Sequence, residues 1–68
     1  MRIELNGRPA ELPDQATVAD AVSATGVEDE SRGVAVALDG EVVRRVEWRA
    51  TRLREGQAVE VVRAVQGG

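Results

Sequence analysis

The sequence contains no cysteine, histidine or lysine, and tryptophan is its only aromatic residue. Without cysteine the chain has neither a disulfide nor a thiolate zinc site. Without cysteine and histidine it also lacks the usual nucleophilic thiol, the usual general base and the commonest metal ligand. Without lysine, no side chain can accept an isopeptide bond. These absences favour a protein that is acted upon, so we expect no enzyme activity, no metal site and no bound cofactor.

Long apolar runs are also missing. The longest uninterrupted one spans five residues, 34–38, whereas a membrane-spanning helix needs about 20. The first residues alternate polar and apolar side chains and do not form the apolar stretch of a signal peptide. A net charge of −3 argues against nucleic acid as a partner. We therefore expect a cytoplasmic protein that binds neither membranes nor nucleic acid.

The pattern along the 68 residues predicts one small domain built from strands and one main helix. Asn6-Gly7 and Asp39-Gly40 each follow an apolar strand pattern and favour tight hairpin turns. Thr17 can cap a helix, with Asp20 as the acid of a capping box and Gly26 at its end. We expect Trp48 to anchor a helical turn, residues 46–49, in the core. The predicted strands are residues 1–6, 8–12, 34–38, 41–43 and 58–65.

This order of elements indicates an α+β domain with the β-grasp, or ubiquitin-like, layout. We expect a mixed sheet of four to five strands with one main helix packed on one face. The first and last strands lie side by side in the centre, and the Pro9 strand lies at an edge because proline cannot donate a ladder hydrogen bond. The predicted organisation is a β-grasp domain at residues 1–64 followed by a flexible Gly-Gly tail at residues 65–68.

The chain ends in Gly67-Gly68, and two interpretations of this end are open. Residues without Cβ atoms can approach another protein's backbone closely, so the end could thread a narrow slot. It would then present the terminal carboxylate of Gly68, a weak electrophile until it is activated, for example as a mixed anhydride with a nucleotide. The alternative is a frayed terminus without a role.

A small apolar surface is predicted next to this end. If Val59 and Val61 face the helix, Val62 and Ala64 lie on the open face of the sheet. Ala35 and Ala37 of the middle strand would lie on that face too. We predict a partner-docking surface formed by Val62, Ala64, Arg63, Ala35 and Ala37. Scattered exposed alanines without any role are the alternative.

The ordered combination of these segments resembles the thiamine-biosynthesis sulfur carriers of the ThiS family. The resemblance covers nearly the whole chain. Its segments are the first strand with Asn6-Gly7, Pro13-Asp14 before Thr17-Val18-Ala19-Asp20, residues 33–43, Glu47-Trp48, Leu53-Arg54-Glu55-Gly56, and residues 59–68.

The resemblance implies a carrier that serves other enzymes as a co-substrate. An E1-like adenylyltransferase would use ATP to adenylate Gly68, and sulfur from a persulfide donor would convert it to a thiocarboxylate. A thiazole synthase would take this sulfur for the thiazole ring of thiamine. Gly67, Gln66 and Val65 would thread into the partner, and the free chain would be a monomer.

Three alternatives share parts of this chemistry or structure. One is a related carrier for molybdopterin or another sulfur-containing metabolite. The second is a ubiquitin-like modifier whose Gly68 is joined to amines of target proteins. The third is a β-grasp interaction module with an incidental tail.

Overall fold

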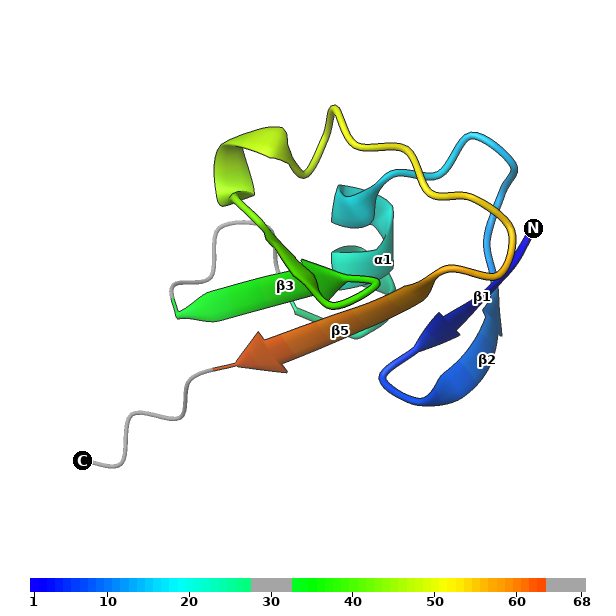
Figure 1. The fold of residues 1–68 in the computed structure, drawn as a ribbon, viewed down its shortest axis with the longest axis horizontal. Coiled ribbons are helices and arrows are strands. Elements are labelled where there is room, and N and C mark those ends of the chain that lie inside the picture. The colour runs from blue at the N-terminus through cyan, green and yellow to red at the C-terminus, as the bar shows by residue number, and fades with distance from the viewer. Residues whose placement is uncertain (28–32, 64–68) are drawn as a thin grey trace.

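The structure is a computed structural model that describes residues 1–27 and 33–63. Within these ranges the chain forms five strands, one α-helix and one 3-10 helix (Figure 1). The elements follow in the order β1 (Arg2–Leu5), β2 (Arg8–Glu11), α1 (Val18–Ala24), β3 (Val34–Leu38), β4 (Glu41–Val43), η1 (Arg45–Glu47) and β5 (Ala58–Arg63).

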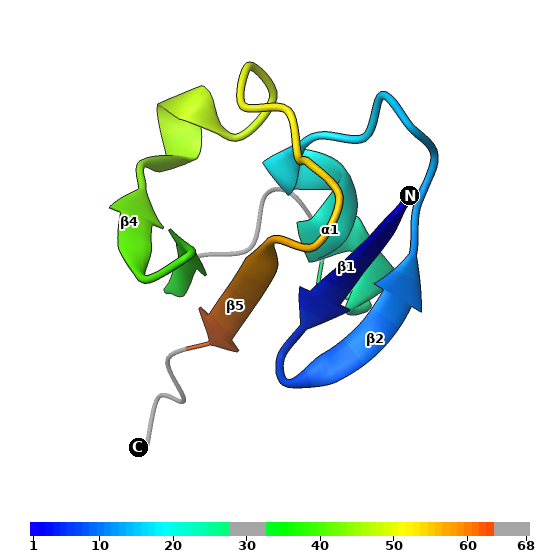
Figure 2. The same cartoon turned by 45° about the vertical axis from the view of Figure 1, so that its right-hand side comes forward.

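The strands form one mixed sheet in the order β2-β1-β5-β3-β4. β1 and β5 run parallel in the middle, and the other neighbouring strands are antiparallel. β2, which contains Pro9, is an edge strand, so the missing N–H of proline interrupts no ladder. With α1 on one side of the sheet (Figure 2), this is the predicted β-grasp fold.

Both predicted hairpin turns are confirmed by their backbone angles. Asn6 and Gly7 have φ values of 51° and 82°, and Asp39 and Gly40 have 49° and 87°. A type I′ turn requires a positive φ at both central residues, and asparagine, aspartate and glycine tolerate it best. The two turns join β1 to β2 and β3 to β4.

The helix begins at the predicted capping box. The Thr17 backbone N–H donates to Asp20 Oδ2 at 2.8 Å, and the Asp20 N–H donates to Thr17 Oγ1 at 3.4 Å. The next two N–H groups bond elsewhere: Val18 N–H donates to the Thr51 carbonyl at 2.9 Å and Ala19 N–H to the Trp48 carbonyl at 3.1 Å. The chain after η1 therefore satisfies donors that the first turn of a helix leaves unpaired.

Thr17→Ala removes one half of this capping box while the helix keeps its bonds to residues 48 and 51. We expect the free energy of unfolding to fall by about 1 kcal/mol, the usual cost of losing such a cap. Thr17→Ser keeps the hydroxyl and should restore most of the stability. Urea denaturation followed by circular dichroism measures both changes, and equal stability of the alanine variant and the wild type would contradict the capping role.

The core lies between α1 and one face of the sheet. Val18, Ala21 and Val22 of the helix are fully buried, as their spacing predicts. They pack in one cluster with Ile3, Val36 and Val59, each from a different strand. The helix ends near Gly26, which has a φ of 88°, and Val27 joins the same cluster. Burial on this face leaves the opposite face of the sheet uncovered by α1.

The 3-10 helix begins at Arg45, one residue before the predicted helical turn. Trp48 follows it and is only 3% exposed, so its predicted role as a core anchor is confirmed. Its indole N–H donates to the carbonyl of Val43 at 3.0 Å, which ties the segment back to the end of β4. Arg45 lies over the indole ring at 4.8 Å from its centre and covers its outer side.

Candidate functional site: the last strand and the open face

β5 lies in the middle of the sheet, between β1 and β3 (Figure 1). Its first residues pair with β1, Glu4 with Ala58 and Leu5 with Val59. β3 pairs with β5 along its whole described length, from Leu38 opposite Val59 to Val34 opposite Arg63. The second half of β5 therefore has a neighbouring strand on one side only.

Several predicted site residues come after this strand. Gly68, Gly67, Gln66, Val65 and Ala64 lie outside the described residues. Their roles, and the boundary between a domain at residues 1–64 and a tail at residues 65–68, stay predictions. The end of β5 at Arg63 is the last described point on the path to Gly68.

The structure brings together three of the predicted docking residues. Val62 lies directly opposite Ala35 in the β3–β5 ladder, and Ala37 lies opposite Glu60. Val62 is 60% exposed, Ala35 is exposed and Ala37 is half-buried. Because residues opposite one another share a face, these side chains lie on the face away from the helix. Arg63, one residue after Val62, lies on the other face by strand alternation.

Val42 of β4 extends this surface, and the sequence analysis missed it. It lies opposite Ala37 and is 77% exposed. The signal was present, because a two-residue turn at Asp39-Gly40 fixes the pairing of Leu38 with Glu41 and thus of Ala37 with Val42. We call the surface formed by Val62, Ala35, Ala37 and Val42 the open-face patch.

Both hairpin turns also hold β5 through their side chains. Asn6 Oδ1 accepts the backbone N–H of Val61 at 2.8 Å. Asp39 Oδ1 accepts the N–H of Ala58 at 2.9 Å, and Asp39 Oδ2 accepts from Gln57 Nε2 at 3.0 Å. These two hydrogen bonds, first to the Ala58 backbone and then to the Gln57 side chain, lower the pKa of Asp39 below its usual value. β5 is thus fixed at its start by one turn and near its end by the other.

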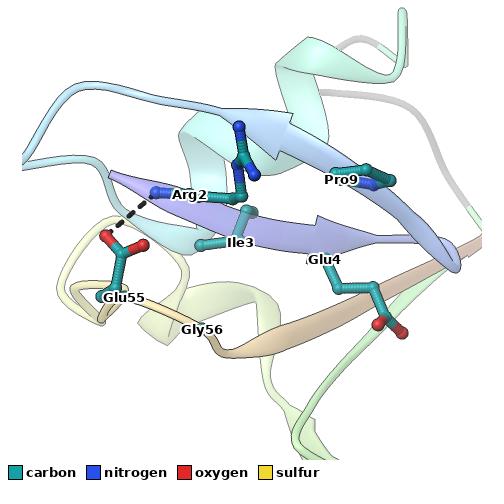
Figure 3. A pocket seen from close by; sticks show the side chains of 6 residues that line it. All are labelled: Arg2, Ile3, Glu4, Pro9, Glu55 and Gly56. Atoms are coloured by element: carbon teal, nitrogen blue, oxygen red, sulfur yellow. Dashed lines mark hydrogen bonds between the residues drawn. The ribbon is translucent and has the colours of Figure 1, made fainter.

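A pocket of about 300 Å³ lies beside β1 and β2 (Figure 3). Arg2, Glu4 and Pro9 of the first hairpin form one part of its wall, and Glu55 and Gly56 before β5 form another. The Glu55 carboxylate accepts the backbone N–H of Arg2 at 3.1 Å. This bond and that of Gly56 N–H to the Arg2 carbonyl at 2.8 Å join the turn to β1. The pocket is therefore built around contacts that hold the fold.

The described residues offer few means for chemistry of their own. Residues 1–27 and 33–63 contain no group of three or more acidic side chains placed to hold a metal ion. In the same ranges, no helix is long and apolar enough to cross a membrane. What the described structure offers is a strand that side chains of both hairpin turns bind, with an exposed apolar patch beside it.

Comparison with known proteins relates this chain to a known family. The sequence model of the ThiS family matches residues 3–68, a range that includes both terminal glycines. Among curated proteins, none shows significant sequence similarity to the chain.

Solved structures of the same fold extend the comparison. The crystal structure of the thiamine biosynthesis protein ThiS from Geobacter metallireducens is 33% identical, with each chain covered completely and a TM-score of 0.79. The solution structure of a thiamine biosynthesis protein from the same organism has the same identity and TM-score and is covered over 88% of its chain, with all of this chain covered. SAMP1 from Haloferax volcanii shares the fold at 17% identity, with a TM-score of 0.59 and with 98% of this chain and 97% of that chain covered.

Proposed function

Because the chain belongs to the ThiS family, we propose that it is a sulfur carrier of thiamine biosynthesis whose terminal Gly68 becomes a thiocarboxylate. The observation that carries this proposal is the family match over residues 3–68, which runs to the last glycine. The 33% identity to a thiamine biosynthesis protein over the whole of both chains supports the same role. The lack of cysteine and histidine fits a carrier on which other enzymes act.

The proposed chemistry begins with activation of the Gly68 carboxylate. In an E1-like adenylyltransferase, a carboxylate oxygen attacks the α-phosphorus of ATP, pyrophosphate leaves, and an acyl-adenylate forms. This step replaces a poor leaving group, an oxide, with a good one, AMP. ATP is a substrate of the partner enzyme, and we propose that the carrier holds no cofactor of its own.

Sulfur then replaces the nucleotide. The terminal sulfur of a persulfide donor attacks the Gly68 carbonyl carbon, AMP leaves, and an acyl disulfide forms. A second thiol reduces the S–S bond, which releases the thiocarboxylate on the carrier and leaves the thiol oxidised as a disulfide with the donor. The thiocarboxylate sulfur is a strong nucleophile, and a thiazole synthase would take it for the thiazole ring of thiamine.

We propose that the open-face patch docks the body of the carrier on the adenylyltransferase. Val62 supports this choice because it is a large exposed apolar side chain on the strand that leads to Gly68. Gly67, Gln66 and Val65 would thread into the partner's slot, where the absence of a Cβ atom at Gly67 allows a close approach.

The mass of the intact protein tests the proposed function. The untagged chain with a free Gly68 is incubated with ATP, the adenylyltransferase of the same source, a persulfide donor and a thiol that reduces the acyl disulfide. We expect a mass gain equal to the replacement of one oxygen by sulfur, and we expect no gain when ATP is omitted or Gly68 is deleted. Transfer of this sulfur to a product of thiazole synthase would identify the acceptor.

Two results would contradict the proposal. If the enzyme activates another carrier protein but leaves the mass of this chain unchanged, an interaction module is the better description. Amide-linked adducts between Gly68 and lysines of other proteins, formed without any thiocarboxylate, would identify a protein modifier.

A further inference from the structure

Asn6 makes a contact that the turn itself does not require. As a turn residue it needs only its positive φ of 51°. Its backbone N–H nevertheless donates to the Val59 carbonyl at 2.9 Å, and its side-chain Oδ1 accepts the Val61 N–H at 2.8 Å. One residue of the first hairpin thus binds β5 at two successive points on the same edge.

These contacts lie where β5 loses its neighbouring strand. β1 ends at Leu5, opposite Val59, because the chain turns away at Asn6-Gly7. Backbone groups alternate sides along a strand, so those of residues 59, 61 and 63 point to the edge that β1 leaves open. The Asn6 side-chain oxygen accepts the N–H that a backbone carbonyl would accept if β1 continued. Among the described residues, this is the last contact on this edge before β5 ends at Arg63.

From this geometry we infer that Asn6 is a positioning residue for the activation of Gly68. The inference rests on the proposed function. By fixing Val61, Asn6 holds the end of β5, including Val62 of the open-face patch, the next residue along, in one position relative to the sheet. A partner that binds the patch and receives Gly68 in one slot gains from this fixed relation, because the second contact then costs less ordering of the chain.

Asp39 provides a matched comparison within the same strand. It is also the first central residue of a type I′ turn, and its side chain also accepts a backbone N–H of β5, that of Ala58 at 2.9 Å. That contact lies at the start of β5, whereas the Val61 contact lies near its end. Loss of the Asp39 side chain should therefore weaken the fold without loosening the end of β5.

Three variants separate positioning from stability. Asn6→Gly keeps the positive φ and removes the acceptor, whereas Asn6→Asp keeps both. Asp39→Gly removes the matched contact. Each variant is assayed with the full chain and the adenylyltransferase for ATP-dependent release of pyrophosphate, and hydrogen exchange of the Val61 amide is measured in parallel.

We expect Asn6→Gly to raise the KM for the carrier about 2- to 10-fold, the factor that corresponds to one hydrogen bond. Its kcat should stay unchanged, and the Val61 amide should exchange faster. Asn6→Asp should keep the wild-type KM within about 2-fold. Asp39→Gly should lower the melting temperature at least as much as Asn6→Gly and still leave KM unchanged.

Two outcomes would overturn the inference while the proposed function stands: a wild-type KM for Asn6→Gly, or an equal rise in KM for Asp39→Gly. If the wild-type chain released no pyrophosphate with an enzyme that activates another carrier, the proposed function would fail and this inference with it.

Discussion

Trp48→Ala should lower the free energy of unfolding by about 3–5 kcal/mol, as truncation of a large buried aromatic side chain does. Trp48 is the largest side chain of the core and is 3% exposed. Its removal leaves a cavity, and the carbonyl of Val43 loses the indole N–H that it accepts at 3.0 Å. The backbone of the same segment binds the first N–H groups of α1, so the start of the helix should loosen as well.

This loss is large for a chain of 68 residues, whose total stability should be on the order of 3–10 kcal/mol. The melting temperature should fall by about 12–40 °C, at the 4–8 °C per kcal/mol of small domains. Far-ultraviolet circular dichroism is the suitable measurement, because the substitution removes the only aromatic fluorophore.

Two control variants identify the cause of the loss. Trp48→Phe keeps much of the ring volume and loses the indole donor, so its stability should lie between those of the wild type and the alanine variant. Val46→Ala changes a residue of the same segment that is 78% exposed and should shift stability by no more than about 0.5 kcal/mol. A melting temperature of Trp48→Ala within a few degrees of the wild type would contradict the anchoring role.

Local chemistry explains why much of the fold could be predicted from the sequence. Asn6-Gly7 and Asp39-Gly40 determine hairpins through backbone angles that few other pairs tolerate. Thr17 and Asp20 determine the start of the helix through bonds between neighbours in sequence. With both hairpins and one helix placed, few sheet orders remain, and the edge position of Pro9 excludes several of these.

Individual hydrogen bonds between distant segments were not predicted, although the pairing of the first and last strands was. The bond from Val61 to Asn6 joins residues 55 positions apart, and no sequence pattern marks it. The carbonyls of Trp48 and Thr51 bind the start of α1 only because the chain after η1 passes over it (Figure 1). The 3-10 helix begins one residue earlier than predicted because the Glu47 N–H donates to the Arg44 carbonyl at 2.8 Å.

The candidate site was predicted in part for the same reasons. Strand alternation was enough to place Val62, Ala35 and Ala37 on one face. Val42 needed the register of the second hairpin as well. Arg63 was included in the predicted docking surface, although the same alternation places it on the other face of the sheet.

Val62→Arg should raise the KM of the adenylyltransferase for the carrier about 30-fold or more. This factor corresponds to about 2 kcal/mol, the threshold of an interface hot spot. Val62 is the large apolar residue of the open-face patch that lies nearest to the end of β5. A guanidinium in its place would lose its bound water on docking, and no group of the adenylyltransferase is placed to replace that water. Steady-state kinetics of pyrophosphate release, with the carrier as the varied substrate, measures the effect.

The fold should tolerate this substitution, because Val62 is 60% exposed and contributes little to the core. Glu60 lies on the same face and can pair with the new charge, so we expect the free energy of unfolding to change by less than about 1 kcal/mol. A rise in KM with an unchanged melting temperature therefore reports on docking alone.

Val46→Arg is the matched control for this experiment. It makes the same substitution at a valine that is 78% exposed on η1, outside the sheet. Its KM should stay within about 2-fold of the wild type, because an exposed charge away from an interface changes binding little. Val42→Arg, at the outer strand of the patch, should give an intermediate effect. If Val46→Arg raised KM as much as Val62→Arg, the cause would be the added charge, and the patch would lose its role as the docking surface.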